Sequence, residues 1–251
     1  MTTGRVDWGG LHNARDLGGL GGVIAPGALF RSPRLDGLDA HGWRQLVASG
    51  VTTIVDLRND DEVLPLPLRP EHVRVVRAPV EDQGDASFME RWGALLGTPE
   101  YYADSLRRWP SLIAAAVGAV ADAPRGGVLV HCAAGRDRTG LIVALVLRVA
   151  GAPVDAVLDD YELGVRETNA WLASNADRES HLAGAALARS IASKRHSLAE
   201  FLRATDVDGY LRAAGLDRQR LDRLRDRLVD TKIAGRAHST GDSDVAATSL
   251  R

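Results

Sequence analysis

One segment of this chain leaves little choice of fold, because an apolar strand leads through a short loop into a helix that is apolar on nearly every face. The strand is Val128-Leu129-Val130, and the helix runs from Thr139 to Ala150. A helix without a polar face belongs in a protein core. The segment therefore predicts a buried strand and a buried helix, joined by the loop from Cys132 to Arg138.

The rest of the chain alternates between strand and helix patterns. Val51 to Val55 is a β-branched run typical of a buried strand, and Asp39 to Ser49 has a helical pattern with Asp39 as N-cap and Gly50 as its stop. Strands that alternate with helices predict an α/β fold with a central, largely parallel sheet flanked by helices. Further elements are expected as small strands or hairpins in the glycine-rich first thirty residues, a strand at Val73 to Val76, and helices at Ser111 to Ala121, after Pro153 and from Tyr161 to Ala204.

Charge and hydropathy narrow the classes of function. The 31 basic and 33 acidic residues give a formal charge of −2, which argues against broad binding to nucleic acid or to a membrane surface. No apolar stretch behind basic residues resembles a signal peptide, and the most apolar run, Leu141 to Val149, is too short to span a bilayer. We therefore expect a cytoplasmic protein without stable membrane insertion.

The chain has one cysteine, Cys132. A single cysteine excludes an internal disulfide framework and a cysteine-rich metal site. It also excludes a second thiol in the chain that could resolve an oxidised Cys132.

The loop from Cys132 to Arg138, called the anion loop below, has the composition of an anion-binding site. Between a strand and a helix, the backbone N–H groups of such a loop and the helix N-terminus point into one concavity. Gly135 permits a backbone conformation or a close approach that a side chain would hinder. Arg138 can hold two phosphate oxygens in a planar fork, and the same positive field favours a thiolate on Cys132. Together these groups predict phosphoryl transfer.

The order of residues in the loop is His131, Cys132, five residues, Arg138 and Thr139, which is the signature of the protein tyrosine phosphatase superfamily. The loop resembles that of a bacterial subgroup with Ala-Gly-Lys-Asp-Arg, from which it departs by Arg136 in place of lysine. Other stretches similar to this subgroup are Asn13-Ala-Arg-Asp-Leu-Gly-Gly19, Leu29-Phe-Arg-Ser32, Val55-Asp-Leu-Arg58 and Gly209-Tyr-Leu-Arg-Ala-Ala-Gly215.

The resemblance runs from Trp8 to Val229, which implies one phosphatase domain over residues 1–231. The polar, aperiodic stretch 232–251 is expected to be a disordered tail. By position, the resemblance implies that Cys132 is the nucleophile, that Arg138 stabilises the transition state, and that no cofactor or metal is needed. Phosphate would be bound by Ala133, Ala134, Gly135, Arg136, Asp137 and Arg138.

Thr139 and His131 lie on either side of the loop, and the sequence suggests roles for both. Thr139 would support the departing thiolate, cap the helix, or do both. His131 would hold the loop rather than react.

The general acid has several candidates. The resemblance favours Asp137 in the loop, although this side chain could instead form a salt bridge with Arg136 or Arg58. Asp56 is second, because it ends a buried strand where open α/β sheets bind ligands. A third set of candidates follows another strand and consists of Glu81, Asp82 and Asp85. We interpret Trp109-Pro110 as a chance match to the Trp-Pro-Asp loop of other tyrosine phosphatases, because Ser111 follows it instead of an aspartate.

The segment 86–109 is rich in aromatic residues and has a helical pattern. The resemblance suggests a helical lid over the pocket, whereas aromatic residues most often pack in the core. Both interpretations stay open. If a lid exists, it gates access to Cys132.

The leading function is hydrolysis of phosphotyrosine through a phospho-cysteine, with dual or broad specificity. Arg136 adds a cation, which makes a phosphoinositide phosphatase the alternative, unless that side chain points outward and pairs with an acid. A rhodanese-like sulfurtransferase is disfavoured by Arg138-Thr139-Gly140. A binding module for phosphorylated residues is disfavoured because Cys132 and Arg138 are both present. The expected partners are thus a phosphorylated protein or a phosphoinositide.

Overall fold

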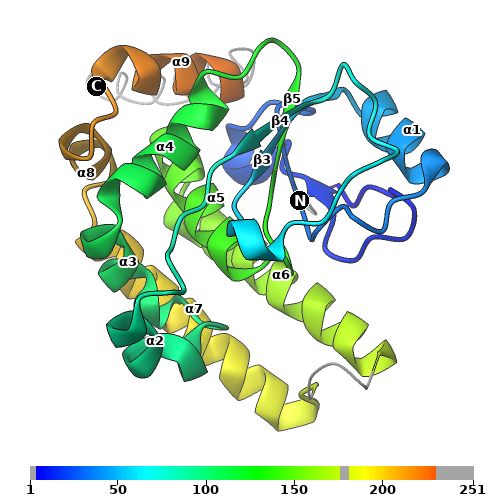
Figure 1. The fold of residues 1–251 in the computed structure, drawn as a ribbon. Helices are drawn as coiled ribbons and strands as arrows, with labels where there is room; N and C mark the ends of the chain where they lie inside the picture. Colours follow the sequence, from blue (N-terminus) through cyan, green and yellow to red (C-terminus); the bar gives the residue numbers. More distant parts are fainter. Residues whose placement is uncertain (1–3, 176–180, 230–251) are drawn as a thin grey trace, which may run out of the picture.

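The computed structural model describes residues 4–175 and 181–229, and within them the chain forms one five-stranded sheet (Figure 1). The strand order is β1-β2-β5-β3-β4, with β1 antiparallel to β2 and the other neighbours parallel. This confirms the α/β fold with a largely parallel sheet. The strands are β1 (Arg15–Asp16), β2 (Leu29–Ser32), β3 (Val51–Asp56), β4 (Arg74–Arg77) and β5 (Gly127–His131).

Helices cover both faces of the sheet, with α1 on one side and most of the others on the opposite side (Figure 1). The α-helices are α1 (Ala40–Ala48), α2 (Ala86–Trp92), α3 (Tyr102–Arg108), α4 (Pro110–Ala121), α5 (Asp137–Val149), α6 (Val154–Ser174), α7 (Gly184–Ala204), α8 (Val207–Ala213) and α9 (Arg218–Leu228). Short 3₁₀ turns are η1 (Leu20–Gly22), η2 (Asp60–Glu62), η3 (Gly93–Leu95) and η4 (Pro99–Tyr101).

Successive residues of the central strands β2, β3 and β5 enter two separate cores. In β5, Leu129 faces the smaller core, which also contains Trp43 of α1, whereas Val128 and Val130 face the larger one. Successive side chains of a strand point to opposite faces. All three are fully buried, which is why this strand has no polar face in the sequence.

Helix α5 is the centre of the larger core, as its apolar composition predicts. Its residues from Leu141 to Leu147 are at most 1% exposed. The helix begins two residues earlier than expected, because the carbonyl of Arg136 already accepts from the N–H of Gly140 at 2.8 Å. Asp137 and Arg138 therefore belong to its first turn.

The parallel strands end at the same edge of the sheet. Ser32, Asp56 and His131 are the last residues of β2, β3 and β5, and these strands lie side by side. The segments that follow them therefore meet, and one of them is the anion loop. Open α/β sheets bind ligands at this edge.

The aromatic rings of segment 86–109 lie in the core. Phe88, Tyr101 and Tyr102 are at most 1% exposed, and the Tyr102 ring contacts Phe201 of α7 edge-on at 5.6 Å. The core interpretation of these aromatic residues is therefore the one that the structure supports. A lid role for 86–109 stays a prediction.

Two other expectations concern the ends and the surroundings of the chain. The tail at 232–251 lies outside the described residues. Within the described ranges, no helix has both the length and the hydropathy needed to cross a membrane. The cytoplasmic location stays a prediction.

Candidate functional site

The anion loop is tightly fitted between β2 and α5. Gly135 has a φ of 65°, and a Cβ on it would lie 2.3 Å from the carbonyl oxygen of Ser32. Such a distance cannot be relieved by rotating a side chain, because the neighbour is backbone. Only glycine fits at this place, and its fit determines the path of the loop.

Several groups hold the loop carbonyls on its outer side. Asn13 Nδ2 donates to the Gly135 oxygen at 2.9 Å, and Arg31 Nη2 donates to the same oxygen at 2.6 Å. The backbone N–H of Arg34 donates to the Ala133 oxygen at 2.9 Å. Because these carbonyls are bonded on the outer side of the loop, its peptide N–H groups face the inner side.

The loop N–H groups are free to bind an anion. Among the described residues, those of Ala133, Ala134 and Gly135 donate no hydrogen bond. Buried backbone donors are nearly always paired in folded proteins. Three successive unpaired donors thus lie beside a helix N-terminus, at the place where the sequence predicts an anion cradle.

Cys132 lies directly after β5 and is 3% exposed. Arg138, in the first turn of α5, is 9% exposed and contributes to the positive potential around this thiol. Burial opposes the charge of Arg138, but Glu62, Cys132 and Glu81 outweigh it and raise the pKa of Arg138, which stays charged.

The guanidinium of Arg138 is held by two carboxylates. Both oxygens of Glu62 accept from its terminal nitrogens, Nη2 at 2.7 Å, and Glu81 lies 3.4 Å from Nε. Glu62 is itself fixed, because its side chain accepts from the backbone N–H of Asn59 at 2.9 Å in a capping box. The bidentate pair orients the fork of Arg138 beside Cys132.

Asp137 is placed at the start of α5 and is partly accessible. Its carboxylate accepts from Arg136 Nε at 2.9 Å and from the Tyr161 hydroxyl at 3.1 Å. The salt bridge with Arg136, the alternative to an acid role for Asp137, is therefore present, no contact of Asp137 with Arg58 is seen among the described residues, and the acid role stays a prediction. Tyr102 adds a hydrogen bond to the backbone oxygen of Asp137 at 2.7 Å.

Thr139 and His131 flank the loop. The Thr139 hydroxyl is buried without a hydrogen-bond partner among the described residues, and Thr139 lies inside the helix rather than at its N-cap. His131 Nδ1 lies 3.1 Å from the Cys132 carbonyl oxygen. Burial lowers the pKa of His131, so the ring is neutral and Nδ1 donates to that carbonyl. This contact fits a supporting role for His131.

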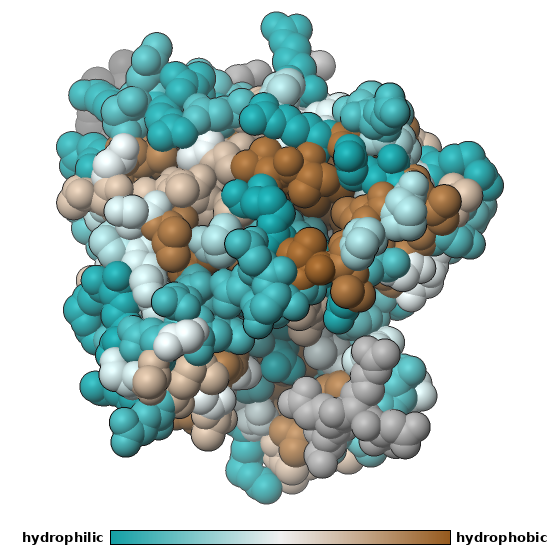
Figure 2. Space-filling view, in the orientation of Figure 1, coloured by the Kyte–Doolittle hydropathy of each residue, from teal (hydrophilic) through white to brown (hydrophobic). Residues whose placement is uncertain are grey.

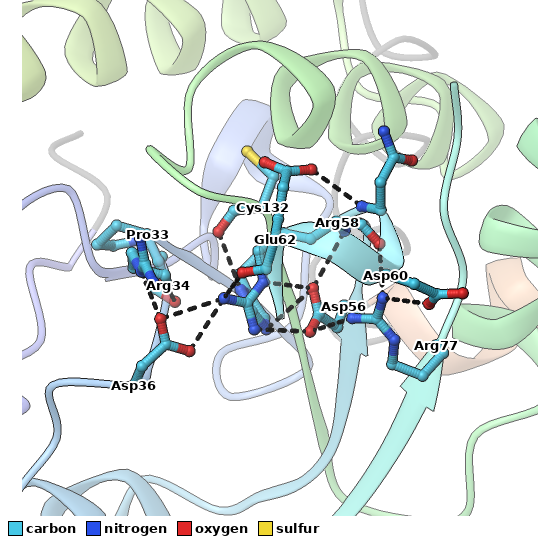
Figure 3. Close-up of polar contacts among 12 residues, drawn as sticks. Pro33, Arg34, Asp36, Asp56, Arg58, Asp60, Glu62, Arg77 and Cys132 are labelled. Atoms are coloured by element: carbon cyan, nitrogen blue, oxygen red, sulfur yellow. Dashed lines mark hydrogen bonds and ion pairs between the residues drawn. The ribbon is translucent and has the colours of Figure 1, made fainter. Parts of the chain in front are cut away.

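The structure ties the carboxylate of Asp56 to two arginines. Its carboxylate is 2% exposed and accepts from Arg58 at 2.9 Å and Arg77 at 2.6 Å, as Figure 3 shows. Burial alone would raise the pKa of Asp56, but the hydrogen bonds from Arg58 lower it to about 2. Asp56 therefore anchors the strand ends through its two arginines, and a role for it as general acid stays a prediction.

The third set of acids separates in the structure. Asp82 closes an exposed turn through the N–H of Gly84, and Asp85 caps α2 through the N–H of Phe88. Only Glu81 of the three reaches the loop, through Arg138. Burial raises the pKa of Glu81. Trp109-Pro110 begins α4, as expected for a chance match.

A cavity of about 670 Å³ adjoins the loop at Ala133, Ala134 and Arg136. Its wall includes Trp171, which stacks on His12 with ring centroids 4.5 Å apart. Another part is Leu64 in the chain after η2, which is 50% exposed. Leu68, further along the same stretch, is 53% exposed, and apolar residues gather on the right of Figure 2. The other lining residues are Gly10, Leu11, Pro33, Arg34, Asp36, Gly37, Thr168 and Leu172.

Sequence reasoning missed the residues that support the loop from behind. Arg15 and Arg31 lie in stretches that resemble the bacterial subgroup, but nothing in their spacing indicated a contact with the loop. Asp160, which binds both arginines, and Glu62, which binds Arg138, gave no signal beyond being acidic residues. No metal site is seen either, since the described residues hold no group of three or more His, Cys, Asp or Glu side chains placed to bind an ion.

These features define a site in which a cysteine and an arginine face one anion cradle, the arrangement used for phosphoryl transfer. The model of the tyrosine phosphatase family matches residues 6–230, and the chain belongs to this family.

Two curated relatives and one solved structure are similar to the chain. The triple specificity protein phosphatase PtpB of Mycobacterium tuberculosis is 31% identical over 182 residues, which are 61% of this chain and 66%, just under two thirds, of the relative. A tyrosine-protein phosphatase of Nostoc commune is 27% identical over 224 residues, 82% of this chain and 76% of the relative. The crystal structure of P. aeruginosa TpbA in complex with pTyr aligns with 84% of this chain and with 100% of its own chain, at 20% identity. Its TM-score of 0.39 is too low to carry an argument.

The fit of Gly135 generates a prediction about ligand binding. Gly135→Ala should weaken binding of tungstate, a phosphate analogue, at least about tenfold, because the added methyl group displaces the loop from Ser32. Titration calorimetry on the folded variant measures this.

The matched control is Gly151→Ala, at a glycine with φ 86° and no atom within 4 Å of the added Cβ. It has the same backbone strain, about 1–2 kcal/mol, without the collision. Tungstate affinity should be unchanged in this control, and equal losses in both variants would contradict the account.

Proposed function

We propose that this protein hydrolyses phosphotyrosine through a phospho-cysteine intermediate on Cys132. The observation that carries the proposal is the set of unpaired N–H groups at Ala133, Ala134 and Gly135, with Cys132 and the fork of Arg138 at the same cradle. The N–H groups of Arg136, Asp137 and Arg138 complete the proposed phosphate-binding set.

In the first step, the Cys132 thiolate attacks phosphorus, so that an S–P bond forms as the bond to the tyrosine oxygen breaks. Arg138 and the loop N–H groups stabilise the charge on the transferred oxygens. Asp137, at the start of α5 beside the loop, gives its proton to the leaving oxygen. The hydrogen bonds from Arg136 and Tyr161 orient its carboxyl group.

In the second step, water attacks the phospho-cysteine, an O–P bond forms and the S–P bond breaks. Asp137, now ionised, accepts the proton of the water and is restored to its acid form. The unpaired hydroxyl of Thr139 donates to the departing Cys132 thiolate. Phosphate then leaves, and the protein is back in its starting state.

The cavity favours a phosphorylated aromatic residue over a phosphoinositide. Its side chains are mostly apolar, and the Trp171 ring offers a stacking surface. The cations at its edge have anionic partners, since Arg136 pairs with Asp137 and Arg34 with Asp36. Beyond the loop, a headgroup with several phosphates would therefore meet mostly apolar side chains.

The substrate ranking tests this proposal. We expect phosphate release from a phosphotyrosine peptide by the wild type in the presence of a chelator, and none by Cys132→Ser. Phosphoinositides should be poorer substrates than the peptide. A phosphoserine peptide in the same panel distinguishes a narrow substrate range from a broad one. The name of the mycobacterial relative describes triple specificity.

Two results of that panel would contradict the proposal. Retained activity in Cys132→Ser would exclude the cysteine mechanism, and dependence on a metal removed by the chelator would contradict catalysis by the protein's own groups. Phosphoinositides as the best substrates would favour the alternative function. Binding of the peptide without turnover by the wild type would favour the binding module.

A leaving-group comparison tests Asp137. Asp137→Asn should slow hydrolysis of an unactivated alkyl or phenyl phosphate about 10²-fold or more, and that of an activated aryl phosphate much less, because only a poor leaving group needs the proton. Steady-state kcat on both substrates measures the difference. Asp82→Asn is the control and should leave both rates unchanged, because Asp82 closes an exposed turn away from the loop. Equal losses on both substrates in Asp137→Asn would remove Asp137 from the acid role.

A further inference from the structure

Three charged side chains are buried together behind the anion loop. Arg15, Arg31 and Asp160 are at most 3% exposed. Asp160 accepts from Arg15 Nε at 2.9 Å through one oxygen and from Arg31 Nη1 through the other. The three residues come from β1, β2 and α6, and are called the buried cluster below.

The buried cluster has an excess of one positive charge. Burial would favour a neutral Asp160, but Arg15 and Arg31 outweigh it and lower its pKa, so it is ionised. Burial lowers the pKa of Arg15 to about 10, which still leaves it charged at neutral pH. Two cations therefore share one carboxylate, away from solvent.

Both arginines reach the loop from this cluster. Arg31 Nη2 donates to the carbonyl oxygens of Gly135 at 2.6 Å and Arg136 at 3.3 Å. Arg15 Nη1 donates to the Asn13 side chain, whose amide donates to the Gly135 oxygen at 2.9 Å. The mechanism proposed above uses none of these side chains.

The fold makes room for this arrangement. Gly164 follows Asp160 by one turn of α6, and a Cβ on it would be in ordinary van der Waals contact, at 3.4 Å, with a guanidinium nitrogen of both Arg15 and Arg31, so α6 packs directly against the cluster. Asn13 adopts a φ of 56°, which is uncommon for a residue with a side chain. The packing and the backbone thus both accommodate the contacts to the loop.

Two physical effects connect the cluster to the cradle. A cation that is hydrogen-bonded to a peptide oxygen polarises that peptide group. The N–H of the same peptide group then becomes a better hydrogen-bond donor. An excess charge held in a medium of low polarity also acts on an anion nearby more strongly than a solvated charge does. Both effects favour an oxyanion in the loop and the thiolate form of Cys132.

We propose that the buried Arg15–Arg31–Asp160 cluster positions the anion loop, holding the carbonyls of Gly135 and Arg136 outward, and supplies part of the positive charge that binds the phosphate group. Arg31 acts through the loop and is a positioning residue. The inference rests on the proposed function in taking phosphate as the ligand.

Arg31→Met tests the cluster by two measurements on the full chain that need no turnover. One is the pH dependence of iodoacetamide alkylation, which reports on Cys132 alone because it is the single cysteine. The other is tungstate affinity by calorimetry. We expect the alkylation midpoint to rise by about one pH unit and tungstate binding to weaken at least about tenfold. The ionisable groups that interact with Cys132 are retained, and they are Arg138, His131, Tyr101 and Tyr102. The carboxylates that interact with these four are retained as well, and they are Glu62, Glu81, Asp137 and Asp56.

Arg227→Met is the matched control. Arg227 also donates to backbone carbonyls, those of Pro124 at 2.6 Å and Gly126 at 2.9 Å, but before the other end of β5. Its loss removes the same kind of contact without touching the anion loop. Both measurements should give wild-type values for this variant.

If Arg31→Met does not fold, Arg31→Lys tests the role of the buried cluster. The ammonium can still neutralise Asp160 but cannot also reach both loop carbonyls, so tungstate binding should weaken while the alkylation midpoint moves less. Wild-type values of both quantities in a folded Arg31 variant would overturn the cluster's role. A wild-type protein that neither binds tungstate nor releases phosphate would instead overturn the proposed function itself.

Discussion

The close contact of Gly135 with the end of β2 is the constraint on which the rest of the site depends. It leaves no space for a side chain, so the loop can follow only one path between β5 and α5. That path turns the loop carbonyls toward Arg31 and Asn13 and leaves the N–H groups of Ala133 and Ala134 for a ligand. An anion site made of backbone donors needs such a constraint, because the donors have no side chains to adjust.

Buried ion pairs then fix the surroundings of the loop. Asp160 binds two arginines behind it, while Asp56 binds Arg58 and Arg77 at the neighbouring strand end (Figure 3). Burying charges costs free energy, and their pairing often does no more than offset that cost. Their value here is geometric, since Asp160 ties α6 to β1 and β2, and the pair of Asp56 with Arg77 ties β3 to β4.

The sequence was sufficient for the elements and the loop, because both depend on local patterns. Asp39 caps α1 and Gly50 ends it, as predicted, and the apolar helix after the loop is the core helix α5. Partner choice is not local, and there prediction failed. Asp56 stands at the expected strand end, but its contact with Arg77, 21 residues away, was not predicted, and the contacts of Asp160 with Arg15 and Arg31 cross about 130 to 145 residues of chain.

The measurement that tests the central claim most directly is to trap the covalent intermediate. The protein is mixed with a phosphotyrosine peptide, quenched in acid during turnover, digested and examined by mass spectrometry. The account predicts a phosphoryl group on the peptide that contains Cys132. Turnover that proceeds with no phosphorylated Cys132, or with the phosphoryl group on a histidine or a carboxylate, would contradict it.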